Sequence, residues 1–333
     1  MELKINNKIK SALDYKTGLY LVFFTALVSG FSIFINSFGV KGFDSSVFTF
    51  SKNIVVAVLL FAVIAAFGNY KELMTLRLNQ WKQLAIIGLI GGSIPFLLFF
   101  KGLQMANSAT SGFIQKLLFV FVAVFAVLFL KEKLNKKFIA GALLLMAGTY
   151  FMIRPDFVFS AWQLLILVAT IFWAAETVYS KHVLKSQKLS GNIVAFGRMF
   201  FGSIFIFIFL AFTGKAGIVL GMNLSQYFWI LITAGLLFAY VVLYYNGLKL
   251  VNASTAASIL VIAAPITTIL SWMFGSATGS ASTVTLFDAL GIISILAGII
   301  LVVLYAKNAD ASFDVSVLDN PSRAEGAKHN GRH

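Results

Sequence analysis

The chain has 333 residues, of which 59% are hydrophobic and only 11% charged, and its mean hydropathy is +0.91. Soluble domains carry about 25% charged residues, so this composition excludes a soluble protein and indicates one that resides in lipid. The chain has no cysteine, which excludes disulfides, thiol catalysis and Cys-ligated metals. The net charge of +14 would suit a nucleic-acid-binding protein, but the basic residues lie between apolar runs, where they set membrane orientation.

Ten apolar segments follow one another along the chain, each close to the roughly 20 residues that a helix needs to cross a membrane. Their apolar runs are continuous rather than alternating, which favours helices over the strands of a barrel. The sequence therefore predicts an all-α polytopic membrane protein with ten transmembrane helices at residues 17–40, 46–68, 82–106, 108–130, 137–154, 160–181, 190–214, 226–249, 254–275 and 285–306.

The two ends of the chain are polar. Residues 1–16 predict a cytoplasmic N-terminal segment. A full-length span follows them instead of a short apolar core with a small-residue cleavage site, so we expect no cleavable signal peptide. Residues 307–333 predict a disordered cytoplasmic C-terminal tail.

Basic residues are divided unevenly between the two sets of alternating loops. Nineteen of the 26 Lys and Arg residues fall on the side of the two termini and four on the opposite side, while Lys52, Lys116 and Arg198 lie within spans. Because positive charge is retained on the cytoplasmic side, both termini are predicted to be cytoplasmic. We expect a multi-pass protein of the plasma (inner) membrane.

An internal repeat relates the two halves of the chain. FFKGLQMANSATSGFI at residues 99–114 and YYNGLKLVNASTAASI at residues 244–259 align at a constant offset of 145, which pairs Gly102 with Gly247 and Thr110 with Thr255. Five spans per half is an odd number, so the second repeat (156–306) must insert upside down relative to the first (17–155). Inverted repeats are typical of secondary transporters, which hold substrate between the halves near the bilayer midplane.

Ten spans in two inverted five-helix repeats resemble the EamA family of the drug/metabolite transporter (DMT) superfamily. The closest local matches are NSATSGFIQKLLFVFVAVFAVLFLKEKLNKKFIAGALLLMAGTY and NASTAASILVIAAPITTILSWMF. The family's Glu-Lys-Leu sequence after the fourth helix is present as residues 132–134, the following Gly as Gly141 and the ninth-helix Pro as Pro265. The fourth-helix Pro is replaced around Phe119, and residues 276–279 lack the Glu expected after the ninth helix. The resemblance implies a permease, often an exporter of amino acids, metabolites or drugs.

Two ionisable residues lie deep inside predicted spans, Lys116 in the fourth and Glu176 in the sixth. Buried charges in a membrane cost about 2.5–3.5 kcal/mol on insertion scales, so they are functional candidates, and the resemblance implies that both face a central cavity. Together they would hold the two charges of a zwitterion. The alternatives are a Lys116–Glu176 ion pair, or a Lys116 side chain that reaches outward to the interface. Glu176 is also a candidate for proton coupling.

Polar and aromatic stripes add further candidates. Ser29, Ser32 and Asn36 share one helix face, and Trp173, Glu176 and Ser180 repeat that stripe at an offset of 144. Cavity lining and interhelical hydrogen bonding both explain the stripe. Three aromatic residues lie on the eighth span, where they either contact substrate or pack: Tyr240, Tyr244 and the adjacent Tyr245.

A basic residue also lies near the start of the second helix of each half. These residues, Lys52 and Arg198, are candidates for a structural or gating role.

Small residues and prolines interrupt two spans. Gly88 and Gly92, with Gly91 between them, permit close helix approach in the third span, and Pro95 and Pro265 can break their helices locally. Such breaks leave backbone groups free for ligands and help gates bend.

These features predict a secondary transporter of small metabolites, amino acids or related zwitterionic or amphipathic compounds, that works by alternating access. The alternatives are a nucleotide-sugar or phosphate carrier of the same superfamily and a non-transporting membrane sensor. No paired acids in the spans, HExxH sequence or phosphate-binding loop is evident, so we expect neither an enzyme nor a cofactor or metal. The expected partners are a small-molecule substrate and lipid, without nucleic acid, in a monomer or weak homodimer.

Overall fold

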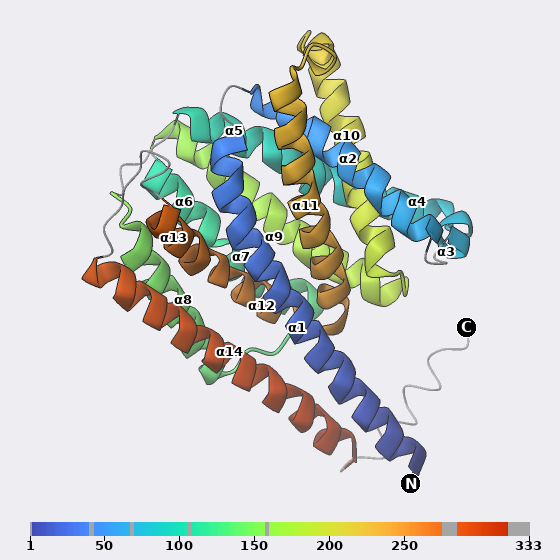
Figure 1. Cartoon of the computed structure of the whole chain (residues 1–333). Helices are drawn as coiled ribbons and strands as arrows, with labels where there is room; N and C mark the ends of the chain where they lie inside the picture. Colours follow the sequence, from blue (N-terminus) through green and yellow to red (C-terminus); the bar gives the residue numbers. More distant parts are fainter. Residues whose placement is uncertain are drawn as a thin grey trace.

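The computed structural model describes residues 2–39, 43–66, 70–105, 108–156, 160–274 and 285–318. Within these ranges the chain is almost entirely helical and contains no strand. Ten helical stretches are long and apolar enough to cross a membrane, which confirms the predicted all-α, ten-span architecture (Figure 1).

The first repeat contains the first five spans, of which the third and fourth are each built from more than one helical segment. The elements are α1 (Glu2–Gly39), α2 (Ser45–Ala66), the short α3 (Tyr70–Met74), α4 (Leu78–Ile87), the π-helical η1 (Gly88–Ser93), α5 (Ile94–Met105), α6 (Ser108–Lys116), α7 (Leu118–Leu130) and α8 (Lys136–Ile153).

The second repeat contains the last five spans, and here the ninth is segmented. The elements are α9 (Ala161–Ser186), α10 (Gly191–Phe212), the 3-10 turn η2 (Ala216–Val219), α11 (Leu224–Leu250), α12 (Ala253–Ile259), the 3-10 turn η3 (Leu260–Ile262), α13 (Ala263–Phe274) and α14 (Leu286–Leu318).

The outer helices extend past their predicted ends. α1 begins at Glu2, within the predicted N-terminal segment, and α14 continues to Leu318, so residues 307–318 are helical rather than disordered. Neither extension contains a proline or glycine, so nothing in the local sequence stops the helix where the apolar run stops. The rest of the predicted tail, residues 319–333, lies outside the described residues, as do Asn107 and residues 276–279.

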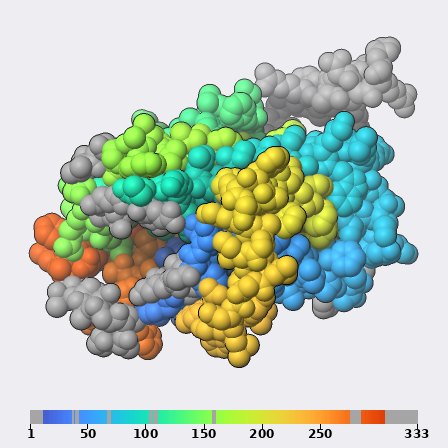
Figure 2. All heavy atoms as spheres, turned by 90° about the horizontal axis from the view of Figure 1, so that it is seen from above, coloured from blue at the N-terminus to red at the C-terminus, as the bar shows by residue number. Residues whose placement is uncertain are grey.

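Helix packing follows the inverted repeat. α1 packs against α11, and its repeat counterpart α9 packs against α5. α2 packs against its own counterpart α10, and α8 against its own counterpart α14. In Figure 1 the α8–α14 pair lies at one edge of the bundle and α2, α4 and α10 at the other. Figure 2 shows segments of both repeats intermingled on the visible face, so the halves interlock instead of forming separate domains.

Glycines bring the paired helices into backbone contact. A Cβ atom at Gly141 would lie 2.7 Å from the Gly298 carbonyl oxygen, and one at Gly148 would lie 2.7 Å from that of Gly291. The two contacts are equivalent by the inverted repeat. Gly141 corresponds to Gly291 and Gly148 to Gly298, each at an offset of 150 residues, so the repeat relates the Gly141–Gly298 contact to the Gly148–Gly291 contact. Small residues allow helices to approach closely in lipid, which explains their positions in α8 and α14.

The repeated glycines of the two matching segments have the same role. A Cβ at Gly102 would meet Ile166 of α9 at 2.7 Å, and one at Gly247 would meet Val22 of α1 at 2.8 Å. The sequence repeat therefore marks equivalent close contacts, of α5 on α9 and of α11 on α1.

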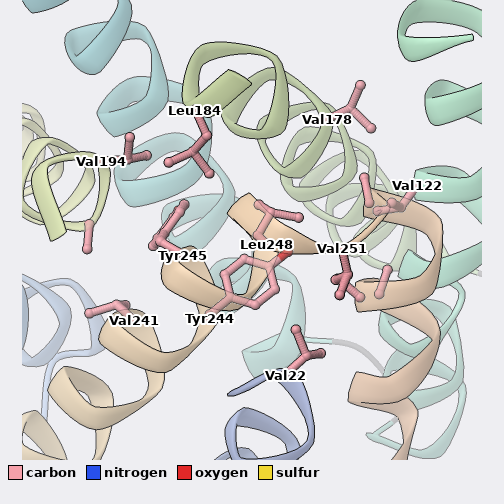
Figure 3. Packing of buried hydrophobic residues seen from close by; sticks show 14 of the residues in the cluster. Val22, Val122, Val178, Leu184, Val194, Val241, Tyr244, Tyr245, Leu248 and Val251 are labelled. Carbon is pink, nitrogen blue, oxygen red and sulfur yellow. The ribbon is translucent and has the colours of Figure 1, made fainter. Parts of the chain in front are cut away.

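The bundle is packed more densely toward one face, which we call the basic face because the Lys-rich connection between α7 and α8 lies there. Every residue of α12 is buried, whereas Ile269 and Trp272 of α13 are exposed. Figure 3 shows Tyr244 and Leu248 of α11 with Tyr245, Val251 and Val22 around them, in one cluster of buried apolar side chains.

The turn between α11 and α12 is held from two sides at the basic face. Lys181 Nζ of α9 donates hydrogen bonds to the carbonyl oxygens of Leu248 and Val251 at 2.8 and 2.7 Å, and so caps the C-terminal end of α11. The Glu132 carboxylate accepts hydrogen bonds from the Ala253 and Ser254 backbone amides at the start of α12, at 2.7 and 3.3 Å. Each charge has the sign that the helix end favours.

Two polar contacts join α2 and α10, one at each end. At the end opposite the basic face, Asp44 Oδ1 accepts from the Ser46 amide at the start of α2, and Asp44 Oδ2 lies 2.6 Å from Lys215 Nζ beyond α10. At the basic face, Glu72 beyond α2 accepts at 2.7 Å from the amide of Ser190, the N-cap of α10. The inverted repeat relates these contacts, with offsets of 146 and 143.

We expect Gly148→Ala to destabilise the protein by about 1–3 kcal/mol, since the added methyl group would overlap the backbone of α14. Gly235→Ala is the control, because no atom lies within 4 Å of a Cβ built there and alanine favours a helix. Unfolding in detergent measures both. Equal stability of the two variants would contradict the close α8–α14 contact.

The Asp44–Lys215 contact predicts a pH-dependent stability. Partial burial alone would raise the pKa of Asp44, but the hydrogen bonds from Lys215 and from the Val47 and Ser46 amides outweigh burial and hold that pKa below its usual value. A lowered pKa stabilises the folded state above the unfolded-state pKa, and this stabilisation is lost as the pH falls through the folded-state pKa.

Asp44→Asn keeps a good N-cap and removes the charge, so we expect it to lower stability by less than about 1 kcal/mol near neutral pH. The difference from wild type should vanish once the pH has fallen below the folded-state pKa of Asp44. Thermal unfolding across pH measures it, with the exposed Asp14→Asn as the control. A pH-independent difference would show that the charge is not responsible.

Candidate functional site

The third span is interrupted where Pro95 follows the π-helical segment η1. In a regular helix the backbone N–H of residue 95 would donate to the carbonyl oxygen of Gly91, four residues earlier. Proline has no N–H, so the Gly91 carbonyl loses this partner in the interior of the bundle. The predicted local break at Pro95 is therefore present, and the freed group is the Gly91 carbonyl.

Two side chains from the second repeat donate to the freed carbonyl. Trp173 Nε1 of α9 and Arg198 Nη2 of α10 each lie 3.1 Å from the Gly91 oxygen. The contact joins the third, sixth and seventh spans at one atom and fixes the position of the Arg198 guanidinium.

Glu176 lies beside this contact, with only 2% of its surface exposed. Ser180 Oγ and the Tyr245 hydroxyl each donate to Glu176 Oε1 at 2.6 Å. Among the described residues nothing donates to Oε2. A Cβ at Gly91 would lie 2.8 Å from the carboxyl carbon of Glu176, so only glycine allows the carboxyl group to approach this backbone.

Arg198 is the cation that faces Glu176. A Cβ at Gly91 would lie 3.2 Å from Arg198 Nε as well, so both side chains pack against the same residue. The guanidinium has one hydrogen bond to the described residues, from Nη2 to the Gly91 carbonyl oxygen. It is 7% exposed, and its Nε has no hydrogen-bond partner in the described part of the chain. The two opposite charges therefore pack against the same glycine without an ion pair within 4.0 Å, and each retains unused hydrogen-bonding capacity.

Aromatic rings surround the charged pair. Tyr240 and Tyr244 of α11 stack with ring centroids 5.6 Å apart, and the Tyr244 hydroxyl is 3.0 Å from Thr177 Oγ1. Phe96 and Phe99 of α5 pack against the Trp173 ring with centroids at 5.2 and 5.4 Å. We call the following residues the central cluster: Gly91, Trp173, Glu176, Ser180, Arg198, Tyr240, Tyr244 and Tyr245.

The first repeat has an equivalent arrangement. Asn36 Nδ2 donates to Ser32 Oγ at 3.0 Å, as Ser180 donates to Glu176. Lys52 Nζ of α2 donates to Asn36 Oδ1 at 2.8 Å and lies 4.8 Å from the centre of the Phe48 ring. The structure thus brings the three candidates Ser32, Asn36 and Lys52 together.

Lys116 lies apart from this chemistry. It ends α6, directly before the break at Leu117 that divides the fourth span. Within the described residues it forms neither a hydrogen bond nor an ion pair, so the interpretation of a Lys116–Glu176 ion pair is not supported. The sequence interpretation considered Glu176 together with Lys116 of the fourth span, whereas helix packing turns Arg198 toward Glu176.

Sequence reasoning gave Gly91 no role except close helix packing, and it named Tyr245 only as a neighbour of Tyr240 and Tyr244. One signal for Gly91 was present, because a proline four residues later removes the usual donor to its carbonyl. No comparable local signal identified Tyr245, since the direction of its hydroxyl depends on how α11 packs against α9.

Comparisons with known proteins agree with this architecture. The chain matches the EamA-like transporter family over residues 16–154 and 160–304. It is 33% identical over 110 residues, 33% of this chain and 77% of the relative, to a Sinorhizobium protein named as an uncharacterized transporter in the cobO 3' region. It is 25% identical over 216 residues, 61% of this chain and 71% of the relative, to the riboflavin transporter ImpX of Fusobacterium nucleatum subsp. nucleatum.

A solved structure described only as the crystal structure of a protein shares the fold, with a TM-score of 0.68 and 17% identity over 87% of this chain and 97% of that one. Both five-span halves match the same family, in agreement with the inverted repeat seen in the structure. The chain is a multi-pass membrane protein that belongs to the EamA-like transporter family.

Proposed function

We propose that this protein moves small zwitterionic compounds with an apolar part, such as amino acids, across the membrane by alternating access. The observation that carries the proposal is that Glu176 and Arg198 pack against the same glycine inside the bundle, with an unused acceptor on one and an unused donor on the other.

The chemistry of the central cluster suits such a ligand. A substrate ammonium would donate to Glu176 Oε2, and a substrate carboxylate would accept from Arg198, as charge-assisted hydrogen bonds. Trp173 and the Tyr240–Tyr244 stack offer apolar faces to the rest of the molecule. The hydrogen bonds between the substrate charges and the two side chains would then compensate for part of the hydration that these charged groups lose inside the bundle.

We assign Glu176 a ligand-binding role ahead of proton coupling. The support is that two hydroxyl groups donate to Glu176 Oε1 and leave Oε2 for a donor of the ligand. Flux measured at two pH values tests proton coupling directly. Lys116, which is separate from the central cluster, is kept as a candidate for the access path.

A phosphate-type carrier and a carrier of zwitterions need a different net charge at the substrate site. A phosphate-type carrier would require cations in excess at the substrate site, whereas Arg198 is balanced by Glu176 in the central cluster. A planar aromatic substrate is the second candidate, because the rings of Phe96, Phe99 and Trp173 pack together beside the charged pair and one relative is named as a riboflavin transporter.

For the orientation, we propose that the basic face is cytoplasmic, with both termini there and the protein in the plasma (inner) membrane. The support is the excess of Lys and Arg on that side. The same assignment makes the densely packed face the cytoplasmic one.

Transport is tested in proteoliposomes with labelled amino acids, nucleosides, nucleotide sugars and riboflavin. We expect saturable amino-acid flux, and a loss of about 10- to 100-fold in Glu176→Gln and in Arg198→Gln, because each removes a charge-assisted contact of about 1.5–3 kcal/mol. The exposed Lys82→Gln is the control. Unchanged flux in both site variants would contradict the proposed site, and flux of riboflavin or of nucleotide sugars alone would replace the zwitterion. Absence of flux for every compound would favour a sensor.

We expect Tyr245→Phe to lower the stability of the protein by about 1–3 kcal/mol, since it removes a hydrogen bond to a buried carboxylate. Tyr240→Phe is the matched control, because the Tyr240 hydroxyl forms no hydrogen bond to the described residues. Thermal unfolding in one detergent compares them. A smaller effect of Tyr245→Phe than of Tyr240→Phe would show that the Tyr245–Glu176 contact does not contribute.

A further inference from the structure

The first repeat contains a basic side chain without an acidic neighbour inside a span. Lys52 Nζ donates to Asn36 Oδ1 at 2.8 Å and lies over the Phe48 ring. No carboxylate of the described residues lies within 4.0 Å of it. A charge in this position is costly unless it is paired.

The inverted repeat shows which group is missing. Lys52 corresponds to Arg198, and Asn36 corresponds to Ser180, at offsets of 146 and 144. Ser32 occupies the position of Glu176. The second repeat therefore provides both charges of its cluster, whereas the first provides the cation and a neutral hydroxyl.

We propose that Lys52, Asn36 and Ser32 form a subsite for a carboxylate-bearing ligand, whose negative charge takes the place that Glu176 fills in the second repeat. The ammonium has three N–H donors, and Asn36 accepts from one of them. All three residues are partly buried, and the ammonium forms no second hydrogen bond to the described residues. That the ligand is transported cargo rests on the proposed function, but the subsite itself does not.

The subsite is linked to the central cluster through the backbone. Asn53, which follows Lys52, donates from Nδ2 to the Gly92 carbonyl at 3.0 Å, and the preceding carbonyl, of Gly91, holds Arg198. Lys52 is two turns from the start of α2 and Arg198 two turns from the start of α10. Because these helices are inverted, the two cations lie toward opposite faces. A carboxylate could thus contact Lys52 nearer one face and Arg198 nearer the other.

The absence of cysteine permits a direct test with the full chain in lipid nanodiscs. Ser32→Cys is treated with methanethiosulfonate reagents that carry either a sulfonate or a trimethylammonium group, and each rate is divided by that for a free thiol. We expect the negative reagent to react about tenfold faster or more, since Lys52 attracts it at short range. Lys52→Gln in the same background should abolish the preference, and Lys52→Arg should retain it.

Ile33→Cys is the matched control, because neighbouring residues of a helix point in different directions, and it should show no charge preference. Ser29→Cys, one turn away on the same face, serves as a second reporter. Equal rates for the two reagents at both reporters, or no reaction at either, would overturn the proposal. A preference that survives Lys52→Gln would overturn it as well.

Protection then identifies the source of the negative charge. At constant ionic strength, set with a bulky sulfonate buffer salt to keep screening equal, sodium acetate should slow the negative reagent about threefold or more. Slowing by acetate alone supports a carboxylate of an organic ligand, and slowing by sodium chloride as well supports a free anion at the same subsite. Slowing by neither would overturn binding. None of these rates depends on flux, so a charge preference without transport would remove the proposed function and leave the subsite.

Discussion

A backbone carbonyl in the interior of a membrane protein needs a donor, because lipid provides none. Pro95 removes the usual donor to Gly91, and the side chains of Trp173 and Arg198 take its place. This one exchange connects spans from both repeats and orients the guanidinium. Since Gly91 has no side chain, Glu176 can approach the same backbone. The charged pair therefore depends on a proline and a glycine four residues apart in another helix.

The two repeats share a scaffold and differ in charge. Glycines at equivalent positions bring α5 against α9 and α11 against α1, and each repeat places a basic residue near an i, i+4 polar pair. The acid is present only in the second repeat, as Glu176 in the position of Ser32. A symmetric framework thus carries an asymmetric distribution of charge, in which the second repeat has both a base and an acid at this position and the first repeat has only a base.

Packing is also asymmetric between the two faces. At the basic face, α12 is fully buried and its first turn is held by Glu132, while Lys181 caps the end of α11. The turn between α11 and α12 is therefore held by one charged side chain on each side, each of the sign that the adjoining helix end favours.

The sequence by itself determined the ten spans and the inverted repeat, because hydropathy, charge bias and repetition can be read from local stretches of the chain. It also marked Lys116 and Glu176 as costly groups deep within spans. Only the tertiary structure decided that Arg198, and not Lys116, faces Glu176, and that Tyr245 donates to it. Which residues meet depends on the rotation of each helix about its axis, and that rotation is set by packing against helices from the other half of the chain.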